Sequence, residues 1–86
     1  MDNSHIVLSY QPFDFTQSIL VYTNGTCIEI KHCKYEEIPE TIIELSKKHN
    51  IKRVDIRGNR EFVEKIKDNL FMPRYGKNQL DVNLHY

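Results

Sequence analysis

Alternating and apolar stretches, separated by turn residues, predict the secondary structure of this chain. Residues 5–10 form a short apolar run with β-branched side chains, which is typical of a strand. Residues 18–23 and 26–31 flank Asn24-Gly25, the pair that two-residue hairpin turns prefer. These two stretches therefore predict a β-hairpin.

The two-residue turn also predicts the register of the hairpin. It places Val21 opposite Ile28 and Ile19 opposite Ile30, and we expect these four side chains to face the core. The other face then carries a mixture of apolar and polar residues: Leu20, Tyr22, Cys27, Glu29 and Lys31. A half-polar face of this kind is expected to be partly in contact with water.

Residues 11–17 separate the first strand from the hairpin. Pro12 and Asp14 are typical of a turn or loop. Phe13 and Phe15 lie in the same loop, and we expect the rest of the domain to cover them.

Two helices are predicted in the second half of the chain. Residues 36–49 have acidic residues at the start and basic residues at the end, which matches the helix dipole. Pro39 is tolerated only in the first turn, so this helix should begin near Ile38. Residues 60–70 form the second helix, and Gly58-Asn59 precedes it as a cap.

Each helix is followed or preceded by an alternating stretch. Residues 51–57 place Val54 and Ile56 on one side, and Arg53, Asp55 and Arg57 on the other. Residues 80–86 alternate again, with inward positions at Leu80, Val82 and Leu84. Both stretches predict strands.

The predicted order is strand, strand, strand, helix, strand, helix, strand. It predicts one α+β domain spanning residues 1–86, a two-layer sandwich with a mixed five-stranded sheet and both helices on one face. Right-handed crossovers should make strands 51–57 and 80–86 parallel neighbours. The other sheet face is left open or is used by a partner.

The order of elements and one local stretch resemble the ribonuclease H-like fold. That fold opens with a three-strand meander and continues helix, strand, helix, strand, and VDIRGNREFV resembles its fourth strand running into its second helix. The family has a metal-binding Asp just before an aromatic–Val pair there, whereas this chain has Asn59 before Phe62-Val63. Its first strand also carries an Asp, where this chain has Ser9-Tyr10-Gln11. The resemblance therefore implies the scaffold without the catalytic acids.

Charge and composition exclude several classes of protein. Twelve basic and twelve acidic residues give no net charge, which argues against a polybasic nucleic-acid tail or a cationic membrane binder. Residues 1–46 nevertheless carry a net charge of −5 and residues 47–86 a net charge of +5. No apolar run is long enough for a membrane span, and the first residues lack the features of a signal peptide.

The cysteines point to a reducing compartment. A disulfide scaffold of this length would need more than Cys27 and Cys33. Six residues apart on one strand, they would share a face but lie too far apart for a disulfide. We therefore expect reduced thiols and a cytoplasmic location.

Basic residues at two loops form a candidate anion or nucleic-acid site. Arg57-Gly58-Asn59-Arg60 joins a strand to a helix, where free N–H groups and arginines suit a phosphate. The loop with Arg74, Tyr75 and Lys77 could stack a base and contact a phosphate. An ordinary Gly-Asn turn and a solvated loop are the structural alternatives.

No arrangement of residues predicts catalysis, a metal ion or a cofactor. His32 points away from Cys27 and Cys33 on a strand, so these three residues do not converge as zinc ligands would. No nucleophile elbow or phosphate-binding loop is present. We expect a chain that is not an enzyme.

The open sheet face is the main candidate for function. It is expected to carry an apolar and charged mixture typical of interfaces, formed by Leu20, Tyr22, Cys27, Glu29, Arg53 and Asp55. These residues predict a small interaction protein, with a homodimer possible. The composition, rich in Lys, Glu, Ile and Asn, suits a phage or mobile-element accessory protein that binds a host factor. The alternative is a nucleic-acid or nucleotide-phosphate binding module.

Overall fold

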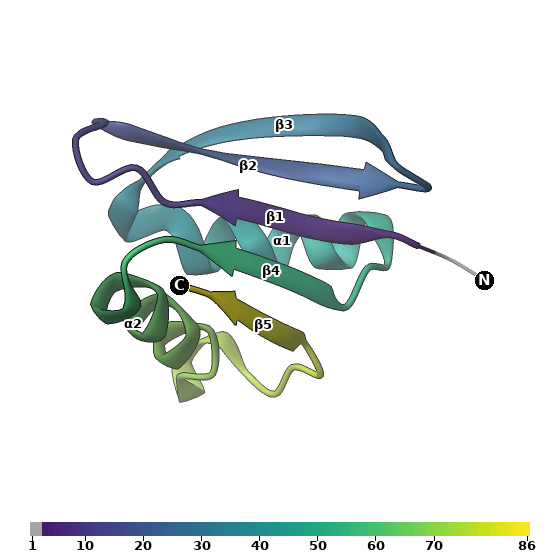
Figure 1. Ribbon diagram of the computed structural model, residues 1–86. Coiled ribbons are helices and arrows are strands. Elements are labelled where there is room, and N and C mark those ends of the chain that lie inside the picture. The colour runs from purple at the N-terminus through teal and green to yellow at the C-terminus, as the bar shows by residue number, and fades with distance from the viewer. Residues whose placement is uncertain (1–2) are drawn as a thin grey trace.

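A computed structural model describes residues 3–86 as a mixed five-stranded sheet and two helices (Figure 1). The strands are β1 (His5–Ser9), β2 (Thr16–Thr23), β3 (Thr26–Lys34), β4 (Arg53–Arg57) and β5 (Asp81–His85). The helices are α1 (Ile38–His49) and α2 (Arg60–Leu70), and short 3-10 turns lie at Tyr35–Glu37 and Pro73–Tyr75. This confirms the predicted α+β class, with two helices on one face of the sheet.

The strand order is β3-β2-β1-β4-β5. β1, β2 and β3 form an antiparallel meander. β4 is parallel to both β1 and β5, so the predicted parallel pairing of the last two strands is confirmed. The carboxyl ends of β1, β4 and β5 therefore lie at the same end of the sheet.

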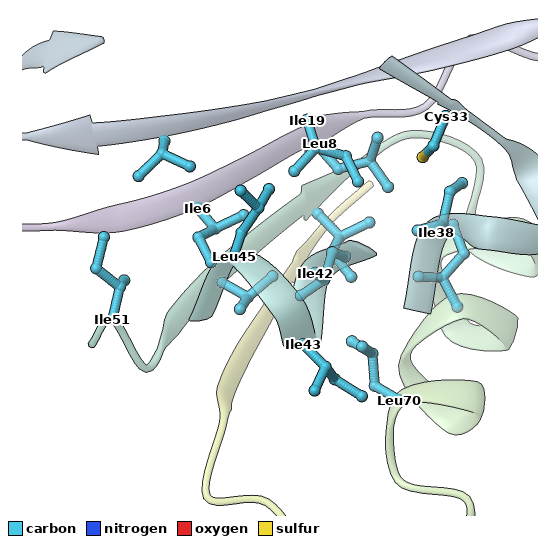
Figure 2. Close-up of a cluster of buried hydrophobic side chains, with 14 of the residues drawn as sticks. Ile6, Leu8, Ile19, Cys33, Ile38, Ile42, Ile43, Leu45, Ile51 and Leu70 are labelled. Carbon is cyan, nitrogen blue, oxygen red and sulfur yellow. The ribbon is translucent and has the colours of Figure 1, made fainter. Parts of the chain in front are cut away.

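One face of the sheet and both helices enclose the core. Alternation places Ile6 and Leu8 of β1 and Val54 and Ile56 of β4 in this core, all without exposed surface. α1 contributes a stripe of buried residues: Ile38, Ile42, Ile43 and Leu45. Figure 2 shows side chains of α1, α2 and the strands meeting in this cluster.

The helix boundaries follow from specific residues. Pro39 lies in the first turn of α1, where a missing N–H costs no hydrogen bond. Asn50 ends α1 in the left-handed conformation, with φ of 53°. Asn59 caps α2, because its side chain accepts a hydrogen bond from the backbone N–H of Glu61 at 3.0 Å.

The hairpin register differs from the prediction after one residue pair. Tyr22 lies opposite Cys27 as expected, but Val21 lies opposite Glu29, and Ile28 is the extra residue of a β-bulge. Every later residue of β3 is therefore shifted by one position, which moves it to the other face. Ile28 and Ile30 were predicted in the core, and the structure leaves them 50% and 54% exposed.

The loop between β1 and β2, residues 10–15 and called the aromatic loop below, also departs from the prediction. Phe13 and Phe15 were expected to be covered, but they are 98% and 93% exposed. Gln17, which is buried at the start of β2, anchors the backbone of the loop. The Gln17 side chain forms hydrogen bonds with the backbone of Gln11 and Asp14. Both phenyl rings therefore lie in water, on a loop whose backbone is bonded to Gln17.

Candidate interaction surface

The sheet face opposite the helices, called the open face below, changes character along one row of paired residues. Ile30 of β3 lies opposite Leu20 of β2, which lies opposite Val7 of β1. Val7 is paired with Asp55 of β4, and Asp55 with Asn83 of β5. The row is therefore apolar over three strands and polar over the last two.

The apolar half of the open face lies on β1, β2 and β3. Val7 and Leu20 are partly exposed, and Ile30 is exposed at the sheet edge. Tyr22 extends this half, with its ring centroid 5.5 Å from that of His5. Neither α1 nor α2 covers these side chains, so they form a continuous apolar surface in contact with water.

The polar half is organised around the carboxylate of Asp55. The His5 ring donates from Nδ1 to Oδ2 of Asp55 at 2.8 Å, and the His85 ring donates from Nε2 to Oδ1 at 3.0 Å. Arg53 donates from Nε to Oδ2 at 3.2 Å. Asp55 itself is only 3% exposed, although it lies on the face without helices. The three donors from β1, β4 and β5 cover it.

The ionised form of Asp55 is stabilised by these donors. Burial raises the pKa of Asp55, but the hydrogen bonds from His5 and His85 lower it. Together with Arg53 they outweigh burial, and the pKa of Asp55 lies below its ordinary value. The charge of this carboxylate is therefore balanced within the cluster.

Arg57 lies next to this cluster and is exposed. It is paired with Ser9 on one side and His85 on the other. Within residues 3–86, Arg57 forms no ion pair with a carboxylate. The polar half of the open face therefore presents the positive charge of Arg57 to water.

Glu29 was predicted on this face, and that placement is wrong. The bulge turns Glu29 toward α1, where it accepts hydrogen bonds from Lys48 at 3.0 Å and from His49 at 2.6 Å. These bonds lower the pKa of Glu29, the His49 bond most strongly. Lys31 moves to the helix side with it, opposite Ile19. Basic residues at the end of α1 suit both the helix dipole and this carboxylate.

The two cysteines are also separated by the bulge. Cys27 is exposed, whereas Cys33 is buried at the edge of the core cluster, and both are free thiols. The prediction that they share a face is therefore wrong, because Cys27 lies opposite Tyr22 on the open face and Cys33 lies opposite Gln17 on the helix side. Burial raises the pKa of the Cys33 thiol.

The Gly58-Asn59 turn has a structural explanation. Gly58 has φ of 143°, and a Cβ atom there would lie 3.1 Å from Cβ of Tyr10. Asn59 is used as the cap of α2. Arg60 lies over the Tyr86 ring at 4.7 Å and approaches Glu64 at 3.7 Å. Of the predicted anion-binding group at this turn, Arg57 alone combines exposure with the absence of a described ion pair.

The second basic loop lies at the other end of α2. Arg74 donates to the hydroxyl of Tyr75 and lines a shallow hollow with Glu36 and Glu40. Lys77 lines a different hollow. The structure therefore does not bring the two predicted basic groups together. Arg74 lies beside the carboxylates of Glu36 and Glu40, so it does not form part of a purely basic surface.

Sequence reasoning missed the partners of Asp55. His5 alternates with the buried residues Ile6 and Leu8, and His85 follows Leu84 in the same way. That alternation places both histidines on the open face. Their convergence on Asp55 could be predicted only with the strand order β1-β4-β5.

Three further observations do not assign a function to the open face. In the described part of the chain, no three His, Cys, Asp or Glu side chains are placed to hold a metal ion. None of the described helices is long and apolar enough to cross a bilayer. Comparison with known proteins found no matching family model and no similar curated sequence.

Proposed function

We propose that this chain is a non-enzymatic protein-binding module that docks through the open face of its sheet. The observation that carries the proposal is the uncovered row of Val7, Leu20 and Ile30. A sheet face of this kind gains free energy when another surface removes it from water.

The two halves of the open face define the kind of partner. An apolar centre is needed opposite Leu20 and Ile30, because interface cores are depleted in charge. Carboxylates are expected opposite Arg57, which lacks a carboxylate partner in the described residues. Asp55 repels such a partner little, because His5, His85 and Arg53 already surround it.

We also propose a cellular compartment and a biological role for this binding module. The free thiols of Cys27 and Cys33 support a reducing compartment such as the cytoplasm. The composition supports an accessory protein of a phage or mobile element that binds a host factor. The meander followed by alternating helices and strands supports the resemblance to the ribonuclease H-like fold, which stays a prediction.

A pull-down with the tagged chain, run with and without nuclease, tests whether it binds a protein partner. We expect a discrete protein that survives nuclease treatment and that depends little on salt. Leu20→Asp and Ile30→Asp should abolish its capture, because each places a charge in the apolar half. Lys31→Asp is the matched control, since Lys31 lies on the same strand but on the helix side.

The nucleic-acid alternative makes the opposite prediction. Capture would disappear with nuclease and would weaken steeply with salt, because phosphate contacts release counterions. Arg57→Ala, Arg60→Ala and Arg74→Ala would then reduce binding, whereas Leu20→Asp would not. That result would overturn the docking role of the open face.

A further inference from the structure

The aromatic loop displays two phenyl rings on a fixed backbone. Phe13 and Phe15 are 98% and 93% exposed. Gln17 is only 2% exposed, and its side chain anchors the loop backbone. The backbone N–H of Gln11 donates to Oε1 of Gln17 at 2.9 Å, and Nε2 of Gln17 donates back to the Gln11 carbonyl at 2.8 Å. A further bond reaches the Asp14 carbonyl at 3.3 Å.

A tethered loop of this kind is suited to docking. A mobile loop would lose conformational entropy on binding, whereas this backbone is already held by Gln17. Two large apolar side chains in water gain free energy when they are buried. Asp14 lies between the two phenylalanines and gives the loop a negative charge.

The same chain carries a hollow with complementary properties. After α2, an open hollow of about 540 Å³ is lined by Phe71, Pro73, Gly76, Lys77 and Asn78. Phe71 and the neighbouring Met72 are exposed. The hollow is therefore bordered by apolar side chains and contains one basic side chain.

Charge favours a match between the loop and the hollow. Lys77 is exposed, whereas Arg74 nearby interacts with Tyr75 and faces Glu36 and Glu40. Asp14 of one copy and Lys77 of another therefore attract each other when the loop approaches the hollow.

We propose that the aromatic loop of one copy docks into the hollow of a second copy. Phe13 and Phe15 pack against Phe71 and Pro73 of that copy, and Asp14 lies beside its Lys77. The loop follows β1, and the residues that line the hollow follow α2, so the contact joins two different surfaces. Two copies can exchange this contact about a two-fold axis, or repeated contacts can build rings or open chains.

Sedimentation velocity of the purified chain over a wide concentration range tests this contact. We expect the mean size to grow with concentration beyond that of the monomer. Phe13→Ser with Phe15→Ser should weaken association by about tenfold or more, because both rings are lost. These side chains are exposed, so the fold should persist, and circular dichroism checks that it does.

A charge exchange makes the test specific. Asp14→Lys alone and Lys77→Asp alone should each weaken association, because like charges then meet in every contact. An equal mixture of the two variants should restore it, since opposite charges face each other in every mixed contact. A chain that stays monomeric, phenylalanine variants that associate normally, or a mixture without restoration would overturn the proposal.

This contact is independent of the proposed docking of the open face. Ile30→Asp is the matched control, since Ile30 lies on β3 and outside both the loop and the hollow. It should leave self-association unchanged while it abolishes partner capture. Failure of the loop–hollow contact would therefore leave the docking of the open face untouched.

Discussion

Leu20 lies directly opposite Ile30 in the β2–β3 pair, one position beyond the partner that an unbroken hairpin would give it. The bulge at Ile28 causes this shift. It moves Glu29 toward two basic residues of α1 and moves Ile30 onto the uncovered face. One inserted residue therefore decides whether the open face is charged or apolar next to Leu20.

Alanine substitutions in the hairpin test the register by stability. Ile28→Ala and Ile30→Ala should lower the free energy of unfolding by less than about 1 kcal/mol, because both side chains are half exposed. Ile19→Ala should cost about 2–5 kcal/mol, since that side chain is fully buried. Urea denaturation measures all three. Equal large losses at Ile28 and Ile30 would support the unbroken register instead.

Thiol reactivity gives a second test of the same region. Cys27 should react rapidly with a thiol reagent such as DTNB in the native chain, because it is exposed. Cys33 should react slowly, because it is buried and because burial raises its pKa and so reduces its thiolate. Both should react rapidly in denaturant. The Cys27→Ser and Cys33→Ser variants assign each phase, and a fast native phase from Cys33 would contradict the structure.

Asp55 should contribute to stability in a pH-dependent way. Its folded pKa lies below its unfolded value of about 3.9, so its stabilisation is complete above that value. The stabilisation is lost as pH falls through the folded pKa. The difference in unfolding free energy between the wild type and Asp55→Asn should therefore shrink on the acid side.

Chemical denaturation from neutral to acidic pH measures this difference. Asp81→Asn is the control, because Asp81 is an exposed carboxylate on β5. A difference between the wild type and Asp55→Asn that stays constant down to low pH would show that the bonds to His5 and His85 do not stabilise the ionised form.

Gly58 should tolerate no side chain. Gly58→Ala places a Cβ in a positive-φ conformation and 3.1 Å from Cβ of Tyr10, and we expect a loss of about 1–3 kcal/mol. Near-ultraviolet circular dichroism should also change, since Tyr10 stacks on Phe62 with ring centroids 4.9 Å apart. Gly25→Ala should lower the free energy of unfolding by less, because a Cβ atom at Gly25 would have no described atom within 4 Å beyond its chain neighbours. Equal losses at the two glycines would mean that contact with Tyr10 has no effect.

The alternation of apolar residues was sufficient to predict the fold. Val54 and Ile56 follow a strand period, Ile38, Ile42 and Leu45 follow a helix period, and all five side chains are buried. Pro39 and Asn59 marked the helix starts because their effects on a helix terminus are local. Pattern and local chemistry therefore fixed the elements and their order.

The candidate surface was harder to predict because it depends on register and on distant contacts. Nothing in the sequence around Asn24-Gly25 signals a bulge, since the extra residue is stabilised by Glu29 reaching Lys48 and His49 on another element. The exposure of Phe13 likewise depends on the buried side chain of Gln17. Interactions of this kind require the folded arrangement.

Hydroxyl-radical footprinting of the captured complex tests the docking role of the open face most directly. Labelling of Leu20, Tyr22 and Ile30 should fall in the complex relative to the free chain, because the partner removes them from water. Phe71 and Met72, which lie outside the open face, should be labelled as before when the complex is kept dilute enough to prevent self-association. Unchanged labelling of Leu20, Tyr22 and Ile30 in the complex would show that the partner does not dock on the open face.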